Sequence, residues 1–208
     1  MRPARAARVA RPYILTRMDA TAIPSQLAAI AEEQLRLDAR VARLMVAVTD
    51  AQWGQRRDPA AWSVAENFAH LNLTSAAMVP RLREAWGRAR AFGAPSGAYR
   101  PRLMGRVLAA MVGPVPTVLG FRMGRVRTAA AFVPGGDLPR ETVMAEFARW
   151  RLEERDLLRD AATLPIDRVT IESPFVPGTH YDGYSALRIL VRHAFRHVDQ
   201  AERVWGTA

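Results

Sequence analysis

Residues 189–200 read ILVRHAFRHVDQ, a stretch with the apolar spacing of an amphipathic helix that carries two histidines. The same period extends from about Ser185 to Val204 and predicts a helix over that range. Because residues four apart lie on one side of a helix, His193 and His197 share a face. Two imidazoles on one turn are a candidate pair of metal ligands, and a metal site needs at least a third.

Three further segments upstream have the same helical period. They span Ile23 to about Val48, Val64 to about Arg90, and about Arg140 to Ala161. The second opens on a capping box, in which the Ser63 hydroxyl and the Glu66 carboxylate each satisfy a free backbone N–H group. A proline inside this segment, Pro80, is expected to kink or break the helix.

Two long connections join these helices. Residues 91–137 are rich in glycine and proline and predict an irregular crossing, with a short helix around Arg102 to Met111. Before the last helix, RVTIESPF, residues 168–175, has the composition of a short strand. The prediction is an all-α four-helix bundle, with long connections between helices two and three and between helices three and four.

The chain's 208 residues, half of them hydrophobic, predict one packed domain over residues 22–205. Residues 1–21 form a basic leader that we expect to be disordered, and Met18 is a second candidate start of translation. The chain has no cysteine. This composition excludes a disulfide framework and a cysteine nucleophile, and it is compatible with the cytoplasmic location that we expect.

The formal net charge of +10 is the one feature that favours a nucleic-acid partner. All the basic residues are arginine, five of them lie within the first seventeen residues, and no aromatic residues alternate with them as in a single-strand-binding groove. The most apolar stretch, residues 107–121, holds two prolines and is shorter than the roughly 20 residues of a membrane-spanning helix. We therefore expect neither a nucleic-acid partner nor a membrane.

A third histidine, His70, lies two turns into the second helix, on an apolar stripe with Phe68 and Leu71. Three imidazoles from two helices of a bundle can hold one divalent cation and leave coordination positions open. Neutral imidazole suits zinc, nickel, iron or copper, and the ligand type does not choose among them.

WSVAENFAHL (residues 62–71) and RHAFRHVDQAERV (residues 192–204) resemble the two signature segments of the DinB/YfiT-like family. AFVPGGDLPRETVMAEFARW and DRVTIESPF lie between them in the expected order, so the resemblance covers about residues 22–205. It implies a four-helix-bundle metalloprotein in which His70, His193 and His197 hold one divalent transition metal, with zinc or nickel favoured. It also makes a homodimer an expectation.

Characterised members of this family use the metal to activate a low-molecular-weight thiol. The resemblance therefore implies an S-transferase type of enzyme whose partners are a small-molecule thiol and an electrophilic substrate. Two alternatives stay open: a metal-dependent hydrolase that activates water by the same chemistry, and a non-catalytic metal-binding protein of the stress response.

Several other residues are candidates for the surroundings of the site. Glu66 lies one turn before His70 and either caps its helix or hydrogen-bonds a ligand. Gln200 extends the stripe of His193 and His197 and either touches the cavity or packs. His180, in the turn-like PGTHYDGY, is a solvated loop residue or lines the mouth of the site. Tryptophans 53, 62 and 150 are expected in the core, and arginines 100, 102, 106, 122, 125 and 127 either form a solvated face or recognise a carboxylate.

Overall fold

The computed structural model describes residues 24–206 except 96, 114–116, 119–120 and 123–127. Four long helices make up the bundle: α1 (Ser25–Ala47), α3 (Val64–Ala89), α5 (Arg140–Ala161) and α6 (Gly183–Trp205). They agree with the four predicted segments to within about two residues at each end. The predicted all-α four-helix bundle is confirmed. The predicted leader, residues 1–21, lies outside the described residues.

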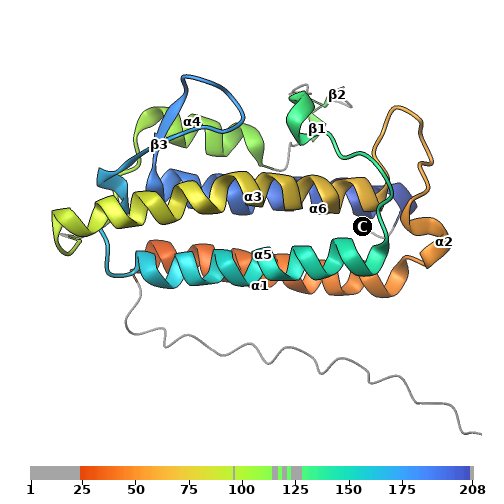
Figure 1. Cartoon of the computed structure of the whole chain (residues 1–208), viewed down its shortest axis with the longest axis horizontal. Helices are drawn as coiled ribbons and strands as arrows, with labels where there is room; N and C mark the ends of the chain where they lie inside the picture. Colours follow the sequence, from red (N-terminus) through yellow and green to blue (C-terminus); the bar gives the residue numbers. More distant parts are fainter. Residues whose placement is uncertain (1–23, 96, 114–116, 119–120, 123–127, 207–208) are drawn as a thin grey trace, which may run out of the picture.

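The bundle has two layers, with α3 and α6 side by side above α1 and α5 (Figure 1). Between the layers α3 packs on α5 and α6 packs on α1, while α3 contacts α6 and α1 contacts α5 within each layer. Helices α3 and α5 run in the same direction (Figure 1). The chain must therefore return along the whole bundle between them, which explains the length of the connection between α3 and α5.

The start of α3 is fixed by the predicted capping box. Ser63 Oγ accepts a hydrogen bond from the Glu66 N–H group, and the Glu66 carboxylate accepts one from the Ser63 N–H group. Pro80, which was expected to kink or break this helix, does not break it, since α3 continues as one helix to Ala89. Pro80 and Ala76 are both exposed, so water can bind the Ala76 carbonyl group that the proline leaves without an N–H partner.

The connection between α3 and α5 contains several short elements: η1 (Arg90–Phe92), α4 (Leu103–Val112), a two-stranded ribbon of β1 (Thr117–Val118) and β2 (Phe121–Arg122), and η2 (Ala130–Phe132). Helix α4 confirms the short helix predicted there and packs on α6. A Cβ atom on Gly105 would overlap Ser185 of α6, so the glycine allows α4 to lie close. The β ribbon was not predicted.

A hairpin of β3 (Thr170–Glu172) and β4 (His180–Asp182) joins α5 to α6, after the short η3 (Ile166–Arg168). The strand predicted within RVTIESPF is thus confirmed, and its partner is the segment directly before α6. Asp182 ends β4 and caps α6, because its carboxylate accepts a hydrogen bond from the Ser185 N–H group. The hairpin therefore fixes where α6 begins.

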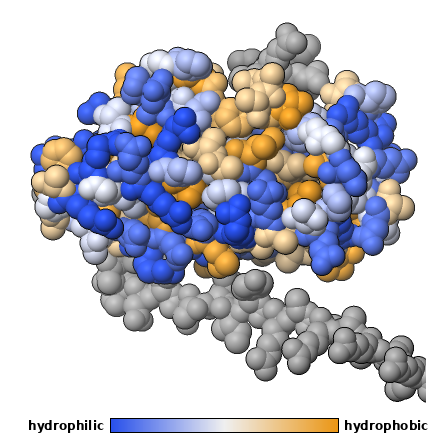
Figure 2. All heavy atoms as spheres, viewed as in Figure 1, coloured by the Kyte–Doolittle hydropathy of each residue, from blue (hydrophilic) through white to orange (hydrophobic). Residues whose placement is uncertain are grey.

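The interior consists of two hydrophobic clusters along the bundle. One is centred on Trp86, Leu82 and Leu187, and the other on Trp53, Phe68 and Phe147. Trp53 and Trp150 are buried as predicted, whereas Trp62 is half-buried. Hydrophilic side chains cover much of the face shown in Figure 2, and hydrophobic ones gather in the upper middle of that view.

A buried ion cluster interrupts the apolar interior between α1, α3 and α5. Arg151 forms ion pairs with Asp38 and Glu154, and the Ser75 hydroxyl donates a hydrogen bond to Glu154. Arg151 and Glu154 are each only 4% exposed. The apolar period of the sequence gives no sign of this cluster, since both residues occupy inward positions among hydrophobic ones.

Over the part of the chain that the structure describes, no helix combines the length and the hydropathy needed to cross a membrane.

Candidate metal centre

The three predicted histidines meet in one cluster near the end of the bundle where α3 begins. His70 comes from the second turn of α3, and His193 and His197 come from successive turns of α6. Their ring centroids are 4.4–5.1 Å apart, and one nitrogen from each ring lies within 4.8 Å of the other two. Helices α3 and α6 therefore bring together residues that are more than 120 positions apart in sequence.

Two of the rings are held by hydrogen bonds that decide which nitrogen faces the cluster. His70 Nδ1 lies 2.7 Å from the carbonyl oxygen of Phe132 in η2, and His197 Nδ1 lies 2.9 Å from Oδ1 of Asn67. Both oxygens can only accept, so each Nδ1 carries the proton and each Nε2 keeps its lone pair. Asn67 is oriented in turn, because its Nδ2 donates to the Ser63 carbonyl group at 2.8 Å.

The distance between Nε2 of His70 and Nε2 of His193 is 3.0 Å. Without a cation, His193 must donate a proton to His70 across this gap. If His193 carried its proton on Nδ1 instead, both Nε2 atoms would offer a lone pair to a cation, as in sites where neutral imidazole binds a divalent transition metal. The donor set therefore fits such a metal, and imidazoles held through the opposite ring nitrogen are the usual arrangement of histidine ligands.

The surroundings keep the three imidazoles neutral. His70 and His197 are buried, and His193 is half-buried. Burial lowers the pKa of His70, while burial and then the neighbouring histidines lower that of His197 well below its usual value. Burial, His70 and Arg196 lower the pKa of His193 to about 3. A lowered pKa favours the neutral imidazole over the imidazolium ion, and the neutral ring is the form that binds metals.

Aromatic side chains from three connections wall the cluster. Trp62 stacks on His197 with ring centroids 5.8 Å apart and lies 4.9 Å from His70. Phe175, in the turn between β3 and β4, stacks on His193 at 6.2 Å and meets Phe132 at 4.9 Å. Apolar rings around polar ligands lower the local dielectric constant and strengthen electrostatic interactions inside.

The other candidates lie outside the cluster. Glu66 serves the cap of α3 and binds Arg56, which lowers the pKa of the carboxyl group and keeps it charged. His180 is exposed at the start of β4, where its Nδ1 contacts the Gly178 carbonyl group. Gln200 is half-buried on α6. Of the two alternatives given for each residue, Glu66 thus has the capping role and His180 has the solvated position.

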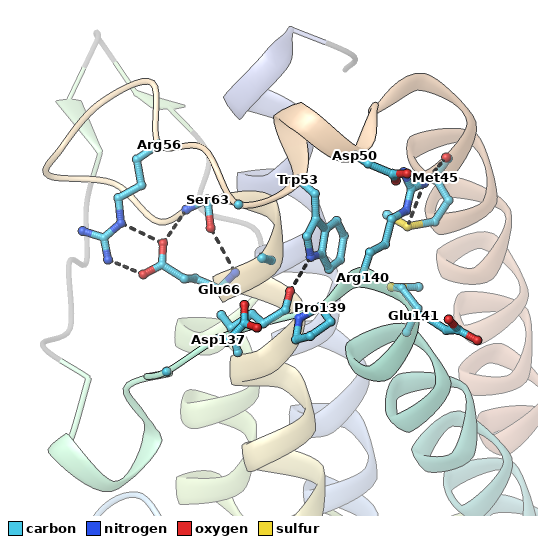
Figure 3. A pocket seen from close by; sticks show the side chains of 15 residues that line it. Met45, Asp50, Trp53, Arg56, Ser63, Glu66, Asp137, Pro139, Arg140 and Glu141 are labelled. Carbon is cyan, nitrogen blue, oxygen red and sulfur yellow. Dashed lines mark hydrogen bonds and ion pairs between the residues drawn. The ribbon is translucent and has the colours of Figure 1, made fainter.

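A pocket of about 1080 Å³ lies beside the start of α3, next to the short helix α2 (Asp50–Trp53) and the start of α5 (Figure 3). Several of its polar side chains are already paired. Arg56 binds Glu66, Arg140 binds Asp50 and the Met45 carbonyl group, and Trp53 Nε1 donates to the Leu138 carbonyl group. The three histidines do not line it. It is distinct from the metal centre.

Sequence reasoning missed the residues that orient the ligands. Asn67 precedes His70 by three positions, and a polar residue at an inward helical position was the signal that could have revealed it. Phe132 and Phe175 lie in irregular connections, where no periodicity indicates which side chain or carbonyl group turns inward.

Two of the arginines named as a solvated face or a carboxylate site, Arg125 and Arg127, fall outside the described residues.

A family model described as DinB superfamily matches residues 33–201. This range includes all three histidines and Asn67. No curated protein and no solved structure gives a significant match.

Proposed function

The chain belongs to the DinB superfamily, and from this premise we propose that it is a metal-dependent enzyme that activates a low-molecular-weight thiol and transfers it to an electrophile. The observation that carries the proposal is the convergence of three neutral imidazoles, two of them fixed by Asn67 and by the Phe132 carbonyl group. We propose zinc or nickel as the metal, because imidazole nitrogen suits both.

The ligand set supports activation of a thiol or water. A divalent cation held only by neutral ligands keeps its full charge and supplies the Lewis acidity that ionises a bound thiol or water near neutral pH. Among the described residues, no carboxylate joins the cluster to reduce that charge. Three protein ligands also leave positions for a small molecule, as in catalytic rather than structural sites.

The remaining residues prepare the site. Asn67 and the Phe132 carbonyl group hold His197 and His70 in the tautomer that presents Nε2, so little reorganisation is needed when a cation is bound. Trp62 and Phe175 keep water away from two sides. The chain has no cysteine, so a sulfur nucleophile has to come from a small molecule.

The experiment that tests the proposal measures metal content and thiol transfer on the same preparations. We expect one equivalent of a divalent metal in the wild-type chain, and loss of retained metal in His193→Ala. The control is His180→Ala, which removes an exposed histidine outside the cluster and should retain the metal. A His193→Ala variant that still binds one equivalent tightly contradicts the three-histidine site.

Activity separates the proposal from its alternatives. Consumption of a thiol with an electrophilic acceptor, dependent on the metal, supports the transferase. Metal-dependent hydrolysis of an activated ester without a thiol supports a hydrolase instead. Full metal occupancy with neither activity supports a non-catalytic metal-binding protein.

A further inference from the structure

Helix α4 carries apolar side chains on the side that is turned away from the bundle. It lies outside the layer of α3 and α6 and packs on α6 and β4 through the side that holds Gly105 (Figure 1). Each residue of a helix is turned about 100° from the next, so the opposite side holds Leu103, Val107 and Met111. All three are exposed, as is Met104 beside them, and the exposed fraction of Leu103 is 74%. These four residues form the outer stripe of α4.

An apolar outer stripe is unusual for a helix on a protein surface. Such a helix normally turns polar side chains to water and apolar ones to the core. The only charged side chain within α4, Arg106, lies at the edge between the packed side and the outer stripe. Leu103, Val107 and Met111 follow one another by one turn, so their side chains are neighbours on the surface. Contiguous exposed apolar side chains with a polar rim mark an interaction surface.

The segment of the chain that contains α4 is strongly basic. Residues 85–136 hold eight arginines and no aspartate or glutamate, in a chain whose net charge is +10. Positive charge is therefore concentrated in the same connection as the outer stripe.

Three of these arginines are exposed at α4: Arg100, Arg102 and Arg106. Among the described residues, none of their guanidinium groups has a hydrogen-bond or ion-pair partner. Two carboxylates approach this segment, but Asp167 and Asp182 accept hydrogen bonds from the backbone N–H groups of Arg100 and Arg102. The outer stripe thus has positive charge beside it that the fold does not neutralise.

Hydropathy and charge together favour one kind of partner. An anionic lipid surface offers phosphate groups to the arginines and acyl chains to the apolar side chains. A second copy of this chain offers apolar surface, but a symmetric contact would bring the two sets of arginines together. A nucleic acid would pair with the arginines and leave the outer stripe, which has no aromatic side chain for base stacking, without a partner.

We propose that the outer stripe of α4 binds the surface of an anionic membrane. Helix α4 lies flat in the interface, with its arginines at the level of the lipid phosphate groups. The expectation of no membrane partner rested on the lack of a spanning segment, and peripheral binding needs only one apolar face on a helix. The binding depends on neither the metal nor the proposed function.

The test measures how the full chain binds lipid vesicles, by flotation. One set of vesicles is phosphatidylcholine, and the other is a mixture of phosphatidylcholine and phosphatidylglycerol. We expect at least about tenfold tighter binding to the anionic vesicles, and weaker binding as salt is added. Leu103→Gln/Val107→Gln should weaken this binding by about tenfold, since both side chains would enter the interface. Val46→Gln is the control, because Val46 is 89% exposed on α1, and it should bind as the wild-type chain does.

A fluorescent label identifies the face that meets the lipid. The chain has no cysteine, so Met104→Cys carries a single nitrobenzoxadiazole label on the outer stripe. Its emission should shift to shorter wavelength when anionic vesicles are added, because the label enters an apolar environment. The same label in Val46→Cys should not respond.

Charge is tested by a matched pair of variants. Arg106→Gln removes a charge at the outer stripe, and Arg36→Gln removes the same charge from an exposed position on α1. We expect Arg106→Gln to weaken binding to anionic vesicles more than Arg36→Gln does. Equal losses would show that the vesicles attract only the net charge of the chain, and would overturn the proposal.

Three other results also overturn it. One is equal binding of the wild-type chain to both kinds of vesicle, and another is a label at position 104 that does not respond to them. The third is a Leu103→Gln/Val107→Gln variant that keeps its affinity for vesicles. If that variant also changes from dimer to monomer in sedimentation, the outer stripe contacts a second copy of the chain instead.

Discussion

The amide oxygen of Asn67 lies 2.9 Å from Nδ1 of His197, and the other end of the same amide group donates to the Ser63 carbonyl oxygen at 2.8 Å. The residue that caps α3 thus also orients, through Asn67, an imidazole on α6. Replacing Asn67 by alanine removes the acceptor that selects the His197 tautomer. We expect Asn67→Ala to weaken metal binding by about 10- to 100-fold while the chain stays folded.

Competition with a chromophoric chelator measures that loss. Asn72→Ala is its control, because Asn72 lies on the same helix but donates to the Val143 carbonyl group of α5. This control should lower the free energy of unfolding and leave metal affinity unchanged. Equal metal affinity in Asn67→Ala and the wild-type chain would show that the hydrogen bond does not orient the ligand.

The pKa values of the histidines predict a pH-dependent stability for the metal-free chain. Burial lowers the pKa of His70, His193 and His197 in the folded state below the value of about 6.5 in the unfolded chain. Above that pH neither state binds protons at these rings. Below it the unfolded chain takes up a proton at each ring before the folded chain does, so the free energy of unfolding falls by up to about 1.4 kcal/mol for each ring with every pH unit of acidification.

Urea unfolding between pH 7.5 and 5 checks this dependence. The window stays above the range in which Glu66, with its lowered pKa, is protonated. A His193→Gln/His197→Gln variant should lose most of the slope, and His180→Ala should keep it. A wild-type stability that stays constant across the window contradicts the prediction.

Two glycines in helices should respond to alanine in opposite directions. A Cβ atom at Gly105 would overlap the Ser185 side chain, so Gly105→Ala should separate α4 from α6 and destabilise the chain by about 1–3 kcal/mol. At Gly87, exposed on α3, nothing lies within 4 Å of the new Cβ atom. Gly87→Ala should therefore stabilise by about 0.5–1 kcal/mol. Thermal unfolding of both variants tests the close packing of α4.

The buried ion cluster predicts a non-additive pair of substitutions. Arg151→Met leaves Glu154 buried with the Ser75 hydroxyl as its remaining partner, which should cost about 3–5 kcal/mol. Adding Glu154→Leu removes the isolated charge and should recover part of that loss, as measured by chemical denaturation. A double variant as unstable as the sum of its single variants would show that the two charges are not coupled.

The sequence by itself determined the bundle and the ligands. Helical periodicity, the Ser63–Glu66 capping box and the spacing of His193 and His197 are local signals, because they depend on residues within two turns of one another. These signals placed four helices correctly and gave the inward direction of His70. The resemblance of two segments to a known family then joined the three histidines into one site.

Only the tertiary structure decided what surrounds those ligands. The Phe132 carbonyl group reaches His70 from an irregular connection 62 residues away, and Asn67 meets His197 across 130 residues. Such contacts depend on how connections without periodicity cross the bundle. The physical reason is that each helix depends on the local sequence of its own residues. The residue that hydrogen-bonds a histidine ligand depends instead on how distant segments pack.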